Sequence, residues 1–205
     1  DHSDTMGGRD SGWLQIYGET HQEAYDNCIQ AVRIAEHMDV RLPAMHMYDG
    51  YVISGAIGPL KMLSDEAVKS FIGPYRPINP LLDTRHPVTV GPFDGLHGFY
   101  FEHKVAQNRA MDRALKVIQD VADEYAAISG RQYGLLDPYM IDDAEIAIVV
   151  VGSTAGTTRL VVDKLRAKGV KAGMVRVRAF RPFPHRAYAE ALQHAKVVGV
   201  LDRAD

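Results

Sequence analysis

A continuous apolar stretch in the last third of the sequence constrains the fold more than any other feature. Residues 146–151 read Ile-Ala-Ile-Val-Val-Val, and a glycine-containing turn follows them. A run of this length and composition is typical of a strand that is covered on both faces of a parallel sheet. Helical patterns at 157–168 and 185–194 then alternate with strand patterns at 170–177 and 197–201. This βαβαβ order predicts an α/β fold with a parallel sheet and right-handed crossovers.

The residues before this unit have a different rhythm. Residues 1–13 are polar and glycine-rich, which predicts a loop, and a short strand is expected at 14–17. Thr20 and Glu23 have the spacing of a capping box, so a helix should begin there. A second strand, interrupted or bordered by a proline, is expected at 40–48.

A long irregular stretch separates the two helices that follow. Ser64 is placed to cap the first of them, which should end near Ile72. Residues 73–92 hold five prolines, and long loops of this kind are commonly functional or wrap around a partner. The second helix, 102–128, should end at Gly130. Its apolar stripe has alternating steps of four and three residues and consists of Met111, Leu115, Ile118, Ala122 and Tyr125.

A polar segment that contains a proline, residues 135–143, lies between the two patterns. We therefore expect two domains, one over residues 1–137 and one over residues 138–205. The sequence stops directly after a strand of the buried type, where a complete sheet would continue, so we expect the second domain to be truncated.

Composition and charge exclude several classes of protein. The formal charge of −3 and a pI near 6.3 give no electrostatic reason to expect a nucleic acid or an anionic membrane as partner. No stretch approaches the roughly 18 apolar residues that span a bilayer. Cys28 is the single cysteine, so neither an internal disulfide nor a four-thiolate iron–sulfur cluster can form, which fits a reducing compartment. It falls on the apolar side of its helix, where we expect it to be inert.

Two loops carry candidate binding residues, and each has an alternative explanation. In the turn Gly152–Gly156, backbone N–H groups at a helix start would suit a phosphate, but two glycines also simply permit a tight turn. The opening loop carries His2, Asp4, Arg9 and Asp10, a dense polar set of the kind that forms sites. A structural loop held by salt bridges explains these residues equally well.

Other candidates have mainly structural explanations. His46 lies within an apolar strand pattern and is expected to be a hydrogen-bonded core residue. Ser54 lacks the surroundings of a hydrolase nucleophile. Arg178, Arg181 and Arg186 bracket Phe-Arg-Pro-Phe-Pro, which either binds an anionic cofactor tail or forms a rigid start to the next helix. Taken alone, these residues predict a two-domain soluble α/β protein without a defined function.

Short motifs along the whole chain resemble, in the same order, those of the pyruvate-type 2-oxoacid:ferredoxin oxidoreductase family. The chain opens on Asp-His-Ser-Asp-Thr-Met at 1–6 and continues with Arg-Asp-Ser-Gly-Trp at 9–13. Two positions depart from the family's pattern: Tyr51 stands where the family has Phe, and Gly55 stands where His is common. The other matching segments are Gln22-Glu23 with Asp26, Asp49-Gly50-Tyr51 with Ser54, Gly130-Arg131 with Tyr133-Gly134, Asp143-Ala144-Glu145, Gly152-Ser153-Thr154-Ala155, Phe180-Arg181-Pro182-Phe183-Pro184 and Val200-Leu201-Asp202-Arg203.

The resemblance implies an architecture and a reaction. Residues 1–137 would be the later part of the domain that binds the pyrimidine of thiamine diphosphate, and 138–205 part of a domain resembling the C-terminal domain of transketolase. The chain would belong to a cytoplasmic alpha subunit, while other subunits hold the Mg²⁺-diphosphate site and the iron–sulfur clusters. Such enzymes of anaerobic metabolism decarboxylate a 2-oxoacid oxidatively on thiamine diphosphate, reduce ferredoxin and transfer the acyl group to CoA.

The resemblance places the family's catalytic Glu, and its substrate-binding Thr and Arg, upstream of this sequence. No catalytic residue is therefore assigned within the chain. His2, Asp4, Arg9 and Asp10 directly follow that upstream region, so they are the expected cofactor-binding residues, as support for the site.

Other functions compatible with these residues stay open. One is an α/β module that serves assembly without chemistry. Another is a subunit of an aryl, branched-chain or oxalate oxidoreductase, since pyruvate is expected only because it is the commonest substrate in the family. A transketolase-like transferase fits the segments 9–13 and 180–184 less well. Neither the direction of the reaction nor the neighbouring subunits follow from the sequence.

Overall fold

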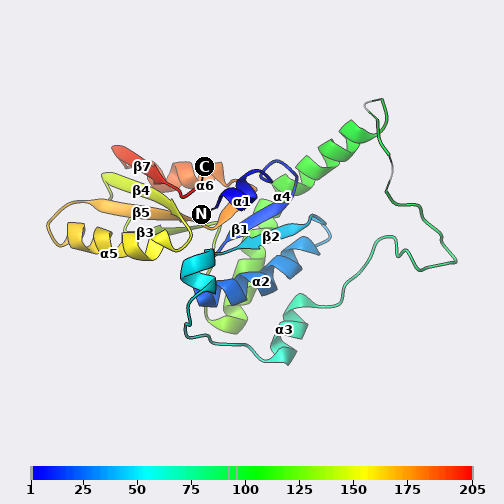
Figure 1. Ribbon diagram of the computed structural model, residues 1–205, viewed down its shortest axis with the longest axis horizontal. Coiled ribbons are helices and arrows are strands. Elements are labelled where there is room, and N and C mark those ends of the chain that lie inside the picture. The colour runs from blue at the N-terminus through cyan, green and yellow to red at the C-terminus, as the bar shows by residue number, and fades with distance from the viewer. Residues whose placement is uncertain (1, 92, 96, 205) are drawn as a thin grey trace.

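The structure, a computed structural model, describes residues 2–91, 93–95 and 97–204. In that part of the chain, two β-sheets lie next to one another along the long axis of the molecule (Figure 1). The α/β class expected from the sequence is confirmed. The residues outside the described ranges are Asp1 of the opening motif, Pro92 of the proline-rich stretch, Leu96 and Asp205.

The first sheet has the strand order β2-β1-β6. β1 (Leu14–Tyr17) and β2 (Ala44–Met47) run parallel and are connected through helix α2 (His21–Ala35), so they form a βαβ unit. The third strand, β6 (Ala179–Arg181), comes from far along the chain and pairs antiparallel with β1. The sequence pattern did not predict β6, because three residues are too few to show a strand period. Its pairing joins the later part of the chain to the first sheet.

The helix ends predicted for this part of the chain are confirmed. Thr20 Oγ1 and Ser64 Oγ accept hydrogen bonds from the N–H groups of Glu23 and Ala67, both at 3.2 Å. Gly130 ends its helix with a φ of 69°, the left-handed conformation that favours glycine. Ser64 precedes α3 (Asp65–Ile72), and Gly130 follows α4 (Tyr100–Ser129). This part of the chain also contains α1 (Ser3–Met6) and the π-helical turn Gly50–Ser54.

Some expected boundaries were wrong. The opening stretch contains α1 and is therefore not a loop throughout. The strand expected at 40–48 is limited to β2, because Arg41 has a φ of 49° and Pro43 cannot donate to a strand ladder. The helix expected at 157–168 begins earlier, at Thr154.

The first core lies between β1, α2 and α4. Leu14 and Ile16 of β1 pack with Ile34 of α2 and with the buried side of α4. The predicted apolar stripe of α4 is confirmed, except that Leu115 is only half-buried. The buried members of the predicted stripe are Met111, Ile118, Ala122 and Tyr125.

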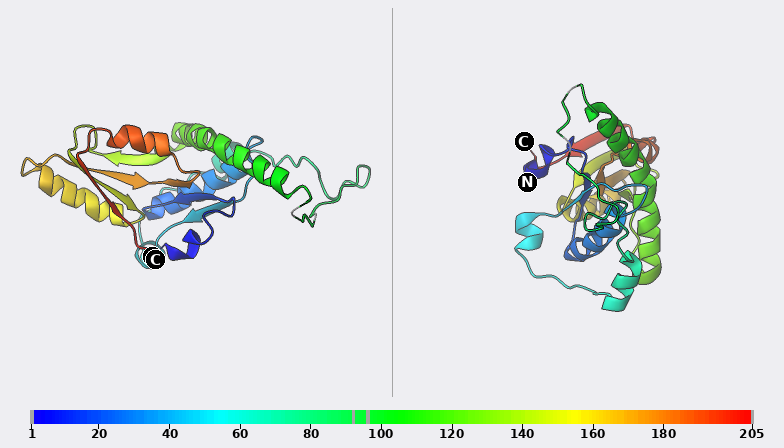
Figure 2. Two further views of the ribbon diagram at one scale, coloured as in Figure 1. Left: turned by 90° about the horizontal axis from the view of Figure 1, so that it is seen from above. Right: turned by 90° about the vertical axis from the view of Figure 1, so that its right-hand side faces the viewer.

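The second sheet has the order β3-β5-β4-β7. The strands β4 (Ile146–Val151), β5 (Ala172–Val177) and β7 (Val197–Leu201) are mutually parallel, as the sequence predicted. The connecting helices α5 (Thr154–Arg166) and α6 (His185–Leu192) lie on opposite faces of this sheet (Figure 2). The remaining strand, β3 (Leu136–Tyr139), pairs antiparallel with β5 inside the segment expected to be a polar connection.

The buried side of α2 is mostly polar, contrary to the sequence prediction. Cys28, expected on a buried apolar face, is exposed. The helix instead turns carboxylate and amide side chains inward because arginines from later segments bind them. These buried polar residues are Glu23, Asp26, Asn27 and Gln30.

Residues 73–99, which we call the arm, connect α3 to α4 and extend away from the body as a loop (Figure 1). The described part of the arm contains neither helix nor strand, which confirms the irregular crossing predicted from its prolines. Among the helices in the described ranges, none is both long enough and apolar enough to cross a bilayer.

Candidate functional site

The carboxyl-terminal ends of strands from both sheets meet in one region. Asp49 follows β2, Ser153 follows β4, and Asp202 follows β7. Figure 2 shows that the two ends of the chain lie close together on the same side of the molecule. Ligands of open α/β sheets bind outside the carboxyl ends of the strands, so this region is the candidate site.

His2 links these segments through both nitrogens of its ring. The side chain is 6% exposed, and its Nδ1 lies 2.6 Å from Asp202 Oδ1. Its Nε2 lies 3.1 Å from Asp49 Oδ1. The backbone N–H of His2 also donates to the carbonyl oxygen of Arg203 at 2.9 Å. We call the group His2, Asp49, Gly152, Ser153, Asp202 and Arg203 the junction.

Asp49 is the centre of the junction. It is 2% exposed, and it accepts hydrogen bonds from Ser153 N–H at 2.5 Å and from Arg203 Nη2 at 2.7 Å. Burial alone would raise the pKa of the Asp49 carboxyl, but the hydrogen bonds from Ser153 and the charges of Arg203 and His2 outweigh it. The pKa of Asp49 is therefore lowered, and the group is ionised at neutral pH.

The turn Gly152–Gly156 binds a carboxylate of the protein itself. The N–H of Ser153, which begins the approach to α5, donates to the carboxylate of Asp49. Gly152 has a φ of 66°, which favours glycine in any case. These observations favour the tight-turn interpretation of this motif over the phosphate site, since a side chain of the protein takes the hydrogen bond of Ser153.

A pocket of about 220 Å³ opens beside the junction. It lies at the carboxyl ends of β1 and β2, where Tyr17 OH and Thr5 Oγ1 are 2.8 Å apart. His2 and Tyr17 meet edge to face, with ring centroids 5.1 Å apart. The pocket is lined by His2, Asp4, Thr5, Tyr17, His46, Met47 and Tyr48.

His46 supplies an unused hydrogen-bonding atom in this pocket. Its Nε2 is buried and has no hydrogen-bond partner among the described residues. Burial and the nearby charge of Arg178 lower the pKa of His46 to about 4, so the ring is neutral at pH 7. The prediction that His46 is a satisfied core residue was wrong, because its strand ends at the pocket and its ring meets Tyr48 there.

The four residues expected to support a cofactor are not brought together. His2 is buried in the junction, and Asp4 is exposed at the rim of the same pocket. Arg9 and Asp10 lie on the exposed turn after α1, where they pair with one another at 3.5 Å. Asp10 is also 3.8 Å from Arg181. Arg9 and Asp10 therefore form the salt-bridged loop of the alternative interpretation.

A second polar cluster surrounds Asp26 of α2. Arg131 binds its carboxylate with two hydrogen bonds, of 2.6 and 2.8 Å. Tyr125 and Tyr133 donate to it at 2.6 and 2.5 Å. Burial opposes ionisation of Asp26, but the hydrogen bonds from Arg131 and the two tyrosines lower its pKa. This cluster locks α2 to α4 and to the segment that follows α4.

A third cluster connects α2 to the second sheet. Arg176 of β5 is 2% exposed and binds Glu23 with two hydrogen bonds of 2.8 Å. It also lies 3.0 Å from Glu19 and 3.1 Å from Asp137. Arg159 of α5 pairs with Glu19 and Asp137 as well. Burial raises the pKa of Glu19, although Arg159 and Arg176 oppose this shift.

Arg178 completes the contact between the two parts of the chain. It is fully buried, and its guanidinium donates to Asn27 Oδ1 and Gln30 Oε1, both at 2.9 Å. Burial lowers the pKa of Arg178 to about 10. A residue held in this way is not available to a cofactor tail. Pro184 stands at the N-cap position directly before α6, which agrees with the rigid-start interpretation.

The sequence patterns did not lead to a prediction of these clusters, although a signal was present. Polar residues recur at helical spacing in α2, and the strand pattern Val-Arg-Val-Arg at 175–178 places two cations in an apolar stretch. Buried charges require partners, so the two patterns could have been matched to one another.

The four residues expected to bind the cofactor do not line one pocket together. Both ring nitrogens of His2 are occupied by carboxylates, and Arg9 and Asp10 do not line the pocket. Within the described ranges, no group of three His, Cys, Asp or Glu side chains is arranged to hold a metal ion. The junction therefore positions backbone and strand ends, while the pocket offers the hydrogen-bonding groups of Thr5, Tyr17 and His46, with the carboxylate of Asp4 at its rim.

Two family models match this chain. Residues 1–123 match the model described as "Pyruvate flavodoxin/ferredoxin oxidoreductase, thiamine diP-bdg". Residues 144–205 match "Pyruvate:ferredoxin oxidoreductase core domain II".

Curated relatives match over nearly the whole chain. Pyruvate synthase subunit PorA of Thermotoga maritima is 50% identical over 204 residues, covering 100% of this chain and 52% of that protein. The same subunit of Methanocaldococcus jannaschii is 42% identical over 205 residues, covering 99% of this chain and 52% of the relative. Ketoisovalerate oxidoreductase subunit VorA of Pyrococcus abyssi is 37% identical over 205 residues, covering 99% of this chain and 51% of that protein. The chain spans about half the length of these relatives.

A solved structure shares the fold. It is a 2-oxoglutarate:ferredoxin oxidoreductase from Magnetococcus marinus, with 2-oxoglutarate, coenzyme A and succinyl-CoA bound. The TM-score is 0.57 at 14% sequence identity, and the match covers 91% of this chain and 34% of that one. At this identity the likeness concerns the fold alone.

Proposed function

This chain belongs to the pyruvate flavodoxin/ferredoxin oxidoreductase family, and from this premise we propose that it is part of the alpha subunit of a thiamine-diphosphate-dependent 2-oxoacid:ferredoxin oxidoreductase. The reaction is the oxidative decarboxylation of pyruvate, or a related 2-oxoacid, with CoA. Its products are the acyl-CoA, CO2 and two electrons, which reduce ferredoxin. Thiamine diphosphate, when bound, supplies the electron sink for loss of CO2.

The junction is the observation that carries this proposal. Segments singled out by their resemblance to the family lie far apart in the sequence, yet they form hydrogen bonds with one another. His2 comes from the opening motif, Asp49 from Asp-Gly-Tyr, Ser153 from Gly-Ser-Thr-Ala, and Asp202 from Val-Leu-Asp-Arg. A chance set of short motifs would have no reason to converge on one buried carboxylate.

The role of this chain is to hold and orient two parts of the active-site region. We divide it into the later part of a pyrimidine-binding domain, 1–137, and part of a transketolase-like domain, 138–205. The junction and the Arg176 cluster fix these parts relative to one another. In this proposal His2 supports the cofactor site indirectly, through the strand ends, and Asp4 faces the pocket. The exposed pair of Arg9 and Asp10 supports the same region from its outer surface.

Other polypeptide supplies the rest of the enzyme in this proposal. The Mg²⁺-diphosphate site and the iron–sulfur clusters belong to other subunits, ferredoxin binds to the assembled complex, and the enzyme is cytoplasmic. Relatives named as subunits of pyruvate synthase and of ketoisovalerate oxidoreductase support an assembly of this kind. They also support either pyruvate or a branched-chain 2-oxoacid as substrate, and the identities of 50% and 42% to two pyruvate synthase subunits favour pyruvate.

The test is an assay of the complete complex purified from its source. Release of ¹⁴CO2 from [1-¹⁴C]pyruvate should require thiamine diphosphate and CoA and should reduce methyl viologen. A panel of pyruvate, 2-oxoglutarate, 2-oxoisovalerate, an aryl 2-oxoacid and oxalate then identifies the substrate. If the intact complex reduces no acceptor with any of these acids, the chain has the assembly role without chemistry.

A further inference from the structure

The chain exposes more surface than a compact protein of its size. Its accessible surface is 12606 Å². A folded monomer of this mass exposes about 9,500 Å². The arm and the start of α4 project from the body and contribute to the excess (Figures 1 and 2). The projecting arm therefore offers surface that a partner can cover.

Large apolar side chains are exposed along the arm. Leu82 is 93% exposed and Phe93 is 103% exposed, as in an unfolded chain. Contiguous apolar groups that face water on a monomer mark binding surfaces. The other exposed apolar residues of the arm and of the first turn of α4 are Tyr75, Ile78, Leu81, Val88, Val90, Phe99, Tyr100 and Phe101.

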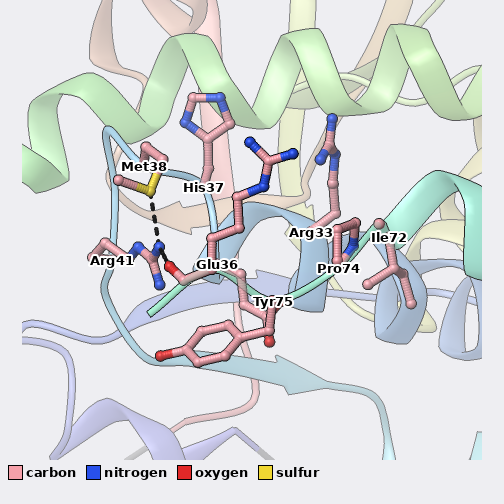
Figure 3. A pocket seen from close by; sticks show the side chains of 10 residues that line it. Arg33, Glu36, His37, Met38, Arg41, Ile72, Pro74 and Tyr75 are labelled. Carbon is pink, nitrogen blue, oxygen red and sulfur yellow. Dashed lines mark hydrogen bonds between the residues drawn. The ribbon is translucent and has the colours of Figure 1, made fainter. Parts of the chain in front are cut away.

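The root of the arm is fixed to the body by Arg41. Its guanidinium donates to the carbonyl oxygen of Arg76 and lies 5.3 Å from the ring centre of Tyr75. Figure 3 shows this contact at the pocket of about 300 Å³ between the ends of α2 and α3. Beyond it, in the described residues 77–91, hydrogen bonds join the arm only to itself, as in His86 N–H to Asp83 O. Farther along the arm, Asp94 lies 2.9 Å from His103 of α4. The arm is therefore tied to the body at both ends, while the residues between these contacts are presented to a partner.

The composition of the arm limits how a partner can bind it. Prolines at 74, 77, 80 and 87 lack backbone N–H groups, so the arm cannot pair continuously with the exposed edge of β7 on a second copy. Proline-rich segments instead place their side chains in grooves lined by aromatic rings. Beyond the root, Pro77 and Pro80 have the spacing of three that puts prolines on one side of such a segment.

The charge of the arm points to a neutral partner surface. Arg76 and Arg85 balance Asp83 and Asp94. Asp83 is further paired within the arm, 3.4 Å from Arg85 and 3.1 Å from His86. An acidic or basic patch on a partner would gain nothing from this segment, whereas an apolar groove would.

We propose that the arm is the surface by which this chain holds another subunit, in an apolar, uncharged groove of that subunit lined by aromatic side chains. The proposal rests on the proposed function, in which this chain is one subunit of a complex. The arm lies in the groove through Leu81, Leu82, Val90 and Phe93, and Arg41 sets its direction. Burial of these side chains contributes to assembly.

Trypsin gives the first test, because Arg85 is a well-placed site. Its side chain is 84% exposed, and Arg76, the other basic residue of the arm, precedes a proline and resists cleavage. We expect cleavage after Arg85 to be at least about tenfold slower in the complete complex than in the isolated full-length subunit. Equal rates in the two samples would overturn the proposal. Since 2-oxoacid oxidation is assayed on the same complex, that failure is distinguishable from failure of the proposed function.

A photo-crosslinker in place of Leu82 identifies the partner. Mass spectrometry of the crosslinked complex should find a peptide of another subunit that is rich in aromatic residues. A crosslink to a second copy of this chain, to its own body, or to no protein at all would each overturn the proposal.

Substitutions test whether the side chains matter. Leu82→Asp and Phe93→Asp should each weaken binding of the partner subunit at least about tenfold, without lowering the helical content or melting temperature of the isolated subunit. Leu160→Asp on α5 is the matched control, because Leu160 is 62% exposed but lies away from the arm. Unchanged assembly of both arm variants, or equal loss in the control, would overturn the proposal.

Discussion

The carboxylate of Asp49 occupies the space that a side chain at Gly152 would need. A Cβ added to Gly152 would stand 2.9 Å from Asp49 Oδ2 and 2.9 Å from His2 Nε2. Both atoms are fixed, since Asp49 also binds Ser153 and Arg203, and the ring of His2 also binds Asp202. The glycine in this turn therefore permits a close approach between a strand end and a buried carboxylate, in addition to its left-handed conformation.

Gly152→Ala should destabilise the full-length subunit by about 3 kcal/mol or more, because a left-handed backbone and a displaced Asp49 both contribute. Gly169→Ala is the control. Gly169 has a φ of 80°, but nothing lies within 4 Å of the position of an added Cβ. Alanine at this position therefore has only the cost of a left-handed backbone. This backbone cost is about 1 kcal/mol. Urea unfolding of both variants measures the difference, and equal losses would show that the space beside Asp49 is unimportant.

Arg176→Met should lower the free energy of unfolding by about 3–5 kcal/mol, because the carboxylates of Glu19 and Glu23 would lose a buried cation. The double variant Arg176→Met with Glu23→Leu should recover part of this loss, with a coupling energy of about 1–3 kcal/mol. Lys116→Met is the control. Lys116 pairs with Asp120 on the exposed side of α4, and such pairs contribute about 0.5 kcal/mol. A loss for Arg176→Met as small as for Lys116→Met would contradict the structural role of the cluster.

The sequence predicted the elements whose signal is local. The strand β4 was recognised from its continuous apolar run, and the stripe of α4 from its helical period. The caps at Thr20 and Ser64 were recognised because their partners lie three residues away. These features depend on residues that are close together in the chain.

The features that were missed depend on partners far away in the sequence. β6 forms only because β1, more than 150 residues earlier, offers it an edge. The inward face of α2 holds Asp26 and Asn27 because Arg131 and Arg178 arrive there from later segments. Similarly, the resemblance pointed to His2, but Asp49 and Asp202 show what His2 does.

Asp26 should make stability depend on pH in the acid range. Its pKa is lowered in the folded protein, whereas an unfolded Asp has a pKa of about 3.9. Its contribution is therefore complete above about pH 5 and is lost as the pH falls through 3.9 toward the lower folded value. Asp26→Asn should be less stable by about 3 kcal/mol at pH 7, with a flatter profile between pH 4 and 2. Urea unfolding across this range measures both effects, and the exposed Asp142→Asn should change neither.

His46 should add a dependence on pH at higher values. Its pKa is about 4 in the folded protein, against an ordinary value of 6.5. Between these values the unfolded chain binds the proton and the folded chain does not, so stability falls as the pH falls from 6.5 to 4. The partly exposed ring should contribute about 2 kcal/mol over this interval, less than the full linkage because solvent screens it.

His46→Gln should remove this slope and leave stability at pH 7 nearly unchanged, because the ring is already neutral there. Unfolding free energies of the full-length subunit at half-unit steps from pH 4 to 7 measure the slope. An NMR titration of the His46 ring checks its pKa directly. The exposed His194→Gln is the control and should keep the slope of the parent protein. A ring that titrates near 6.5 would show that solvent reaches Nε2 and that the pocket beside the junction is open to water.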